Sequence, residues 1–195
     1  ALEAGRAVAR ARYIARMDAD DVAVPHRLAM QIDYLDAHPN VVAVGGQLRN
    51  IDEHGSALSR GRYPLSPSEC RAYLAYGAPL CHPAVMMRRD MLQAVGGYRR
   101  PFEPAEDLDL WFRLSRVGDL ANLDHEVLHY RRHAAAITAS RAQANARAAG
   151  LAHLIHVHGE TIRPPAWHAL HTSDAEWPAI EAELQPHLRL EARAL

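Results

Sequence analysis

The sequence predicts an α/β fold, and two patterns in its first 130 residues carry this prediction. Apolar runs of strand length, such as Tyr13–Met17 and Val41–Val44, follow segments of helical character. In one such segment Leu28, Ile32 and Leu35 recur at helical spacing. A helix-then-strand order along one chain is typical of an α/β sheet covered by helices. With 195 residues, the chain is long enough for one sizeable core with an appendage.

The composition excludes several classes of protein. Hydrophobic residues make up 49% of the chain and the formal net charge is −1, so no global field recruits nucleic acid. All 22 basic residues are arginine, which rules out a lysine Schiff base and leaves guanidinium groups to grip phosphate. The two cysteines, Cys70 and Cys81, make no disulfide framework and favour a reducing compartment. No apolar run approaches the roughly 20 residues of a membrane span.

The elements expected in the first half follow from apolar spacing and from residues that begin or end a helix. Ser66-Pro67-Ser68-Glu69 has the spacing of a capping box and predicts a helix through Tyr76. The other expected elements are a helix over 2–12, a strand over 13–17, a helix with Pro25 in its first turn that ends near 38–40, a strand over 41–44 closed by glycines 45 and 46, and a hairpin of 48–51 with 57–63.

The second half predicts further alternation. We expect a loop over 78–83, a strand over 84–87, a helix over 90–95 stopped by glycines, a loop over 98–104, a helix from Glu106 to Gly118, and strands over 120–123 and 127–130. Helical patterns follow over 138–158 and 174–184. The chain is therefore expected to divide into a main domain over 1–140 and a helical C-terminal extension over 141–195.

Three carboxylates follow the first strand, at Asp18, Asp20 and Asp21. Two unit charges about 5 Å apart repel by roughly 3 kcal/mol at an effective dielectric near 20. Solvent can screen this repulsion in an ordinary acidic turn, or a hard divalent cation such as Mg²⁺ or Mn²⁺ can turn it into attraction. The residues alone leave both alternatives open. Asp21 is expected to cap the helix that follows.

Five blocks of residues, in order, resemble glycosyltransferase family 2. They are Tyr13 to Asp21 with Pro25-His26-Arg27-Leu28 and Gln31, Val44-Gly45-Gly46, Cys81-His82-Pro83-Ala84-Val85-Met86, Gly96-Gly97-Tyr98-Arg99 with Glu106-Asp107-Leu108-Asp109-Leu110-Trp111, and Tyr130-Arg131-Arg132-His133. The likeness covers roughly residues 3 to 140. It implies a GT-A fold, a mixed sheet flanked by helices that binds a nucleotide-activated sugar at the carboxyl ends of its strands.

The resemblance also implies a donor side of the site. Asp20 would hold Mg²⁺ or Mn²⁺ on the donor diphosphate, and Asp18 would contact the ribose or assist the metal. Arg131 or Arg132 would neutralise the leaving group, and His133 would reach the metal or the phosphate. Glycines 45 and 46 would let the backbone approach the ligand, although a turn at the end of a strand needs the same residues.

An acceptor side is implied around the second acidic pair. Asp107 would be the general base of an inverting transfer, with Glu106 orienting the acceptor and Asp109 a weaker candidate. Capping of the helix by these acids is the alternative. His82 would line the acceptor side, or else be a loop histidine bonded to backbone. Trp111 and Phe112 are expected in the core, and a helix surface suits the histidines at 153, 156 and 158 better than a zinc site.

The function expected from the resemblance is transfer of a sugar from a nucleotide-sugar donor to a glycan or lipid-linked acceptor, in surface polysaccharide or glycan synthesis. The expected location is the cytoplasm, with the inner face of the cell membrane reached through a partner. The family begins with a strand and a nucleotide pocket ahead of the matched blocks, so an N-terminally incomplete domain is expected. A metal-dependent phosphoesterase and a non-catalytic binding module are the alternatives.

Overall fold

The structure of the chain is a computed structural model that describes residues 1–132, 146, 148–150, 152–153 and 156. Its elements in chain order are α1 (Leu2–Val8), β1 (Tyr13–Ala15), β2 (Val22–Ala23), α2 (Arg27–Ala37), β3 (Val41–Ile51), β4 (Ala57–Gly61), α3 (Pro67–Tyr73), the 3-10 turn η1 (His82–Ala84), β5 (Met86–Arg88), α4 (Arg89–Ala94), the 3-10 turn η2 (Arg100–Phe102), α5 (Glu106–Leu114) and β6 (Asp119–Arg131).

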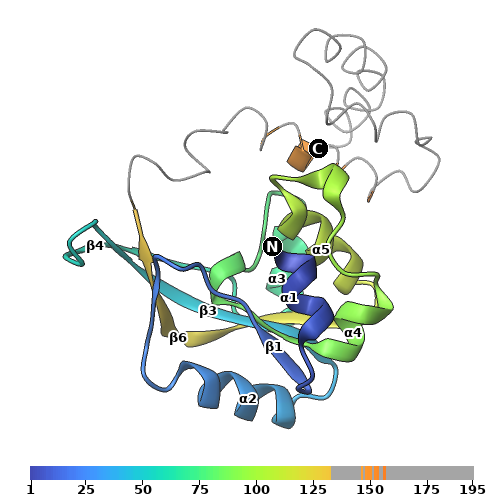
Figure 1. Ribbon diagram of the computed structural model, residues 1–195, viewed down its shortest axis with the longest axis horizontal. Coiled ribbons are helices and arrows are strands. Elements are labelled where there is room, and N and C mark those ends of the chain that lie inside the picture. The colour runs from blue at the N-terminus through green and yellow to red at the C-terminus, as the bar shows by residue number, and fades with distance from the viewer. Residues whose placement is uncertain (133–145, 147, 151, 154–155, 157–195) are drawn as a thin grey trace, which may run out of the picture.

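The strands form one mixed sheet. Its order is β1-β5-β3-β6-β2, and β4 pairs with β3 outside this path. The long central strands β3 and β6 run parallel, while every other pairing is antiparallel. Figure 1 shows the sheet curving between α2 on one face and the group of α3, α4 and α5 on the other. The expected α/β class with a mixed sheet is confirmed.

Strand β3 continues through Gly45 and Gly46, where the sequence predicted a stop. The reason is close packing within the sheet. A Cβ on Gly46 would lie 2.6 Å from a methyl group of Val127, and one on Gly45 would collide with the Asn122 side chain. The two glycines therefore make room for side chains of β6, and the predicted turn is wrong, while the approach of a ligand stays a prediction. The predicted strands over 120–123 and 127–130 are likewise one strand, β6.

Several helix boundaries follow local signals, but α1 ends at Val8 and α3 at Tyr73, before the predicted ends at 12 and Tyr76. Ser66 caps α3 through the predicted capping box with Glu69. Helix α4 ends at Ala94 with Val95 as its C-cap, and Gly96 follows with a φ of 82°, which favours glycine. Helix α2, however, begins at Arg27 with His26 as its N-cap, so Pro25 precedes the helix instead of occupying its first turn.

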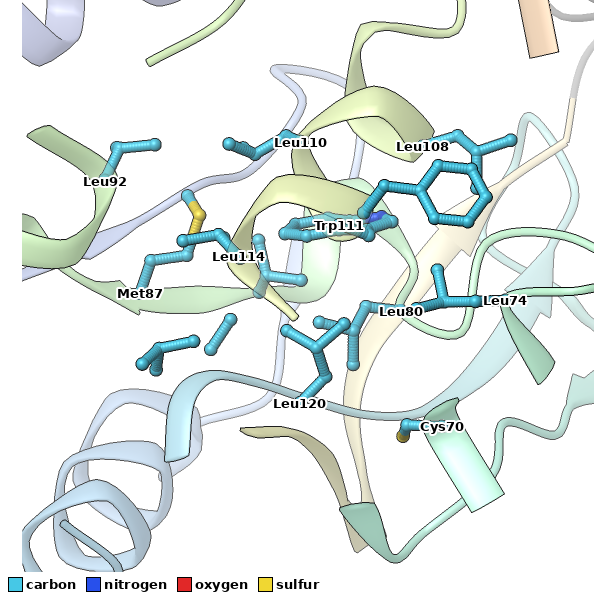
Figure 2. Close-up of a cluster of buried hydrophobic side chains, with 14 of the residues drawn as sticks. Cys70, Leu74, Leu80, Met87, Leu92, Leu108, Leu110, Trp111, Leu114 and Leu120 are labelled. Carbon is cyan, nitrogen blue, oxygen red and sulfur yellow. The ribbon is translucent and has the colours of Figure 1, made fainter. Parts of the chain in front are cut away.

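Two apolar cores lie on the two faces of the sheet. One packs the sheet against α3, α4 and α5, and Trp111 lies fully buried near its centre, as Figure 2 shows. The other packs the opposite face around Leu35 of α2 and Val44 of β3. The expected core position of Trp111 and Phe112 is confirmed.

The helix predicted over 174–184 lies outside the described residues, as does most of the one over 138–158. Two of the described helical residues, Ala148 and Ala152, are buried, and Ala152 belongs to the core around Trp111. The division at residue 140 remains a prediction. In the described part of the chain, no helix has the length and apolar character needed to cross a membrane.

Replacing Trp111 by alanine should destabilise the fold by about 3–5 kcal/mol, because the largest fully buried side chain would leave a cavity between α5 and the sheet. Urea unfolding followed by circular dichroism measures this loss. Tyr76, which is 80% exposed, provides the matched control, and Tyr76→Ala should change stability by less than about 0.5 kcal/mol. Equal losses in the two variants would contradict the assignment of the core.

Candidate active site

The acidic turn lies between β1 and β2. Asp18, Asp20 and Asp21 each offer a ligand atom, and these atoms lie within 4.8 Å of one another. Among the described residues, this is the only group of three or more His, Cys, Asp or Glu side chains placed to hold a metal ion. Oxygen donors of this kind suit Mg²⁺ or Mn²⁺.

Asp18 is paired with an arginine from the end of the preceding strand. The two Nη atoms of Arg16 lie 2.9 Å and 2.8 Å from the two carboxylate oxygens of Asp18. Residues two apart on an extended chain project to the same side, which brings these side chains together. Most of the Arg16 side chain is shielded from solvent, so this bidentate pair is less screened than an ordinary surface pair.

Asp21 is the buried member of the turn, only 7% exposed. Its Oδ1 accepts the backbone N–H of Arg131 at 2.8 Å, while its Oδ2 is buried and has no hydrogen-bond partner. Burial is the main cause that raises the pKa of Asp21 to about 6, and the charges of Asp20 and Asp18 add to it. The expected capping of α2 by Asp21 is wrong, because its carboxylate is bound to β6 instead. An orphaned buried oxygen in an all-carboxylate group fits a divalent cation.

Arg131 holds the acidic turn through its side chain as well as its backbone. Its Nε donates to the carbonyl of Asp20, and its Nη1 donates to the carbonyls of Asp52 and Glu53, all at 2.8 Å. These bonds tie the turn to the β3–β4 hairpin. Of the other residues expected near the diphosphate, Arg132 lies over the ring of Tyr130, and His133 is outside the described residues.

Two buried polar residues of α2 bind the backbone just before the acidic turn and the backbone of η1. Arg27 donates to the carbonyls of Arg16 and Val85 at 2.7 Å and 3.3 Å, and its Nε donates to Gln31. Gln31 donates in turn to the carbonyl of Ala84 at 2.7 Å. Burial lowers the pKa of Arg27 to about 10. The pair therefore joins the end of β1 to the segment that carries His82, which explains the polar residues in this helix.

Glu106 and Asp107 begin α5, as the sequence predicts. Asp107 accepts the N–H of Leu108 at 2.8 Å, and one Glu106 oxygen is buried without a partner. Burial raises the pKa of both carboxyl groups, and the charge of Arg16 opposes the rise in each. Arg16 acts in the same way on Asp21. Arg16 thus acts electrostatically on both acidic groups, so the fold brings the predicted donor side and acceptor side of the site near one guanidinium group.

His82 of η1 is buried beside these groups. Its Nε2 lies 2.8 Å from the hydroxyl of Tyr98, and its ring meets Trp111 edge-on at 6.0 Å between centroids. Burial and the Arg16 charge hold the pKa of His82 well below its usual range, so the ring is neutral. The predicted alternative, a bond from the ring to backbone, is replaced by a bond to a side chain.

Asp109 is bound by two arginines and is not available as a base. It pairs with Arg99, and its Oδ2 lies 2.7 Å from Arg113. Arg113 also donates to the carbonyl of Val95 at 2.7 Å, which fixes the loop after α4 onto α5. Asp109 is buried, so breaking this triad would leave uncompensated charge.

The remaining candidates are structural. Cys70 and Cys81 are both free thiols. His156 stacks on Phe112 with ring centroids 4.1 Å apart, and His153 packs on the same ring. The residue at 158 lies outside the described range.

Two residues of the site, Arg16 and Tyr98, had no role of their own in the sequence prediction, and Asp21 was expected only as a helix cap. Arg16 and Asp21 were part of the resemblance, and the i, i+2 spacing of Arg16 and Asp18 was the signal for their pairing. Tyr98 follows a glycine pair, and nothing local indicates its bond to His82, sixteen residues away.

The fold and the site agree with what the chain resembles. Residues 1–96 match the sequence model of Glycosyl transferase family 2. The amylovoran biosynthesis glycosyltransferase AmsE of Erwinia amylovora is 34% identical over 132 residues, covering 67% of this chain and 49% of AmsE. The O-antigen biosynthesis glycosyltransferase WbnJ of Escherichia coli is also 34% identical over 132 residues, covering 65% of this chain and 51% of WbnJ. The first half of the chain thus matches glycosyltransferase family 2, and the chain spans about half the length of these relatives.

Solved structures confirm the GT-A fold. The crystal structure of residues 1–349 of TarS from S. aureus superposes with a TM-score of 0.55 at 10% identity, covering 86% of this chain and 47% of that one. The mannosyltransferase PcManGT from Pyrobaculum calidifontis, solved with GDP-Man and Mn²⁺, gives 0.53 at 17% identity, covering 100% and 57%.

The buried neutral His82 should make the fold sensitive to acid. Below pH 6.5 the unfolded chain binds a proton that the folded chain excludes, so stability falls as the pH falls. This difference contributes about 1.4 kcal/mol between pH 7.5 and pH 5.5. Urea unfolding at the two pH values should show a loss for the wild type that His82→Gln reduces by about 1 kcal/mol.

The exposed His125 provides the control for this measurement, since His125→Gln should leave the loss unchanged. Equal acid sensitivity in wild type and His82→Gln would show that His82 is protonated in the folded chain.

Proposed function

We propose that this chain carries the catalytic site of an inverting glycosyltransferase that moves a sugar from a nucleoside-diphosphate sugar to an acceptor hydroxyl. The observation that carries the proposal is a carboxylate group suited to a divalent cation together with a second, buried carboxyl pair, both within reach of the charge of Arg16, in a chain whose first half matches family 2. Transfer of this kind needs both parts: one neutralises the departing diphosphate, and the other removes a proton from the acceptor.

The donor side is the acidic turn. Asp20 would hold Mg²⁺ or Mn²⁺, and the Arg16–Asp18 pair would face the ribose and phosphates. A bound divalent cation neutralises charge that builds on the diphosphate oxygen as its bond to the sugar breaks. The cation named with PcManGT, Mn²⁺, and its GDP-Man ligand support this type of donor. Arg131 keeps the turn in place, since its Nε and Nη1 are bound to backbone carbonyls.

The acceptor side is the first turn of α5. Asp107 would take the proton of the acceptor hydroxyl while that oxygen attacks the anomeric carbon from the face opposite the diphosphate. A bond from acceptor oxygen to sugar forms, the bond from sugar to diphosphate breaks, and the configuration inverts. Burial raises the pKa of Asp107, which makes its carboxylate a stronger base, and Arg16 favours the ionised form needed before transfer.

Glu106 and His82 would orient the acceptor. Glu106 shares the first turn of α5 with the base, and its buried unpartnered oxygen can accept a hydroxyl hydrogen bond. His82 is neutral and fixed by Tyr98, which suits a hydrogen bond to a sugar hydroxyl better than a charge interaction.

The names of two relatives support a glycan as acceptor. Those named for amylovoran and O-antigen biosynthesis act in polysaccharide synthesis by their names. We propose a growing glycan or a lipid-linked glycan as acceptor, with synthesis on the cytoplasmic side of a membrane.

Incubation with Mn²⁺ and a panel of nucleotide-sugars should show transfer to an acceptor or slow hydrolysis of one donor, with inverted configuration in the product by NMR. Asp20→Ala and Asp107→Asn should each reduce the rate by about 10²–10⁴-fold, because they remove the cation ligand and the base. The exposed Asp33 of α2 supplies a charge-matched control, and Asp33→Asn should keep full activity. Hydrolysis of simple phosphoesters with no response to any nucleotide-sugar would replace the proposal by a phosphoesterase.

A further inference from the structure

We propose that Asp21, and not Asp18, is the carboxylate that joins Asp20 in binding the divalent cation. This assignment rests on the proposed function only in assuming that a cation is bound. It states which side chains bind that cation. Asp18 then stays paired with Arg16 and lines the site without binding the ion.

The first observation is the state of Asp18. Each of its oxygens lies within 2.9 Å of an Nη atom of Arg16 in a bidentate arrangement. Its charge is therefore already compensated. A cation that bound Asp18 directly would have to displace a largely buried guanidinium group and leave it beside a second positive charge.

The second observation, independent of the first, is the state of Asp21. This side chain is more than nine-tenths buried, and its Oδ2 has no hydrogen-bond partner. Its Oδ1 is bound to the Arg131 N–H, which fixes the carboxylate and leaves only Oδ2 unsatisfied. Buried polar atoms in proteins nearly always have partners. The charges of Arg16 and Arg27 act on Asp21, but neither guanidinium group hydrogen-bonds to its Oδ2, so a cation can supply the missing partner.

The third observation is the spacing of the turn. Mg²⁺ binds oxygen at about 2.1 Å, so two oxygens on one ion lie about 3–4 Å apart. The ligand atoms of the acidic turn lie within 4.8 Å of one another, so a small side-chain adjustment brings Asp20 and Asp21 onto one ion. Two carboxylates and several remaining positions for water or phosphate oxygens suit Mg²⁺ or Mn²⁺.

Electron paramagnetic resonance of free Mn²⁺ measures how tightly the whole chain binds this ion. It tests the assignment without an activity measurement. Asp21→Asn should weaken binding by about tenfold or more, as should Asp20→Asn. Asparagine keeps an oxygen that accepts the Arg131 N–H, so the variant retains this tie to β6.

The matched control is Asp33→Asn on the exposed face of α2, which should bind Mn²⁺ as the wild type does. A second test removes the Arg16–Asp18 pair as a unit, in the double variant Arg16→Gln with Asp18→Asn. Its net charge is unchanged, so Mn²⁺ affinity should stay within about twofold of wild type. A loss in this double variant equal to that of Asp20→Asn, with Asp21→Asn binding normally, would overturn the assignment.

A measurement on the unmutated chain decides the question even if Asp21→Asn fails to fold. During a Mg²⁺ titration, the carboxyl ¹³C signals of Asp20 and Asp21 should shift and that of Asp18 should not. A shift of Asp18 without one of Asp21, or no binding of either ion, would overturn the proposal. Because no sugar donor is used, loss of transfer with Asp21 still binding the ion would count against the proposed reaction alone.

Discussion

The site depends on how the chain holds three carboxylates together within four residues. Left alone, Asp18, Asp20 and Asp21 would repel one another. Two arginines, Arg16 just before the turn and Arg131 of β6, hold the turn together. Arg16 pairs with Asp18, while Arg131 binds the backbone of Asp20 through its side chain and the carboxylate of Asp21 through its N–H. Only Asp21 Oδ2 is left buried without a partner. The turn is thus held in a conformation in which one buried carboxylate oxygen is unsatisfied, and a bound cation would satisfy it.

The same arrangement unites the two sides of the site. Arg16 directly follows β1, and its charge acts on Asp21 of the turn and on Asp107 of α5. Beneath it, Arg27 and Gln31 use a buried network to join β1 to the segment before β5. In the proposed reaction, the leaving group and the base must be held on opposite faces of one sugar carbon. The buried network serves that need on the donor side, because it fixes the backbone before the acidic turn to the segment that carries His82.

Local signals in the sequence were sufficient for most elements and for the family. The capping box of α3, the glycines after α4 and the acids that open α5 act within a few residues, so their effects are readable along the chain. The failures involve partners far away in sequence. Gly45 and Gly46 looked like a stop because Val127 and Asn122, which require them, belong to β6. Asp21 looked like a helix cap because its partner, Arg131, lies 110 residues further on.

The most direct test of the account is anomalous diffraction from crystals of the chain grown with Mn²⁺ and a nucleoside diphosphate. The account predicts one strong manganese peak at the acidic turn, between the Asp20 carboxylate and the phosphate oxygens, with no metal at Glu106 and Asp107. Manganese bound at the α5 carboxylates, or a nucleotide bound away from the acidic turn, would contradict the division of the site into a donor side and an acceptor side.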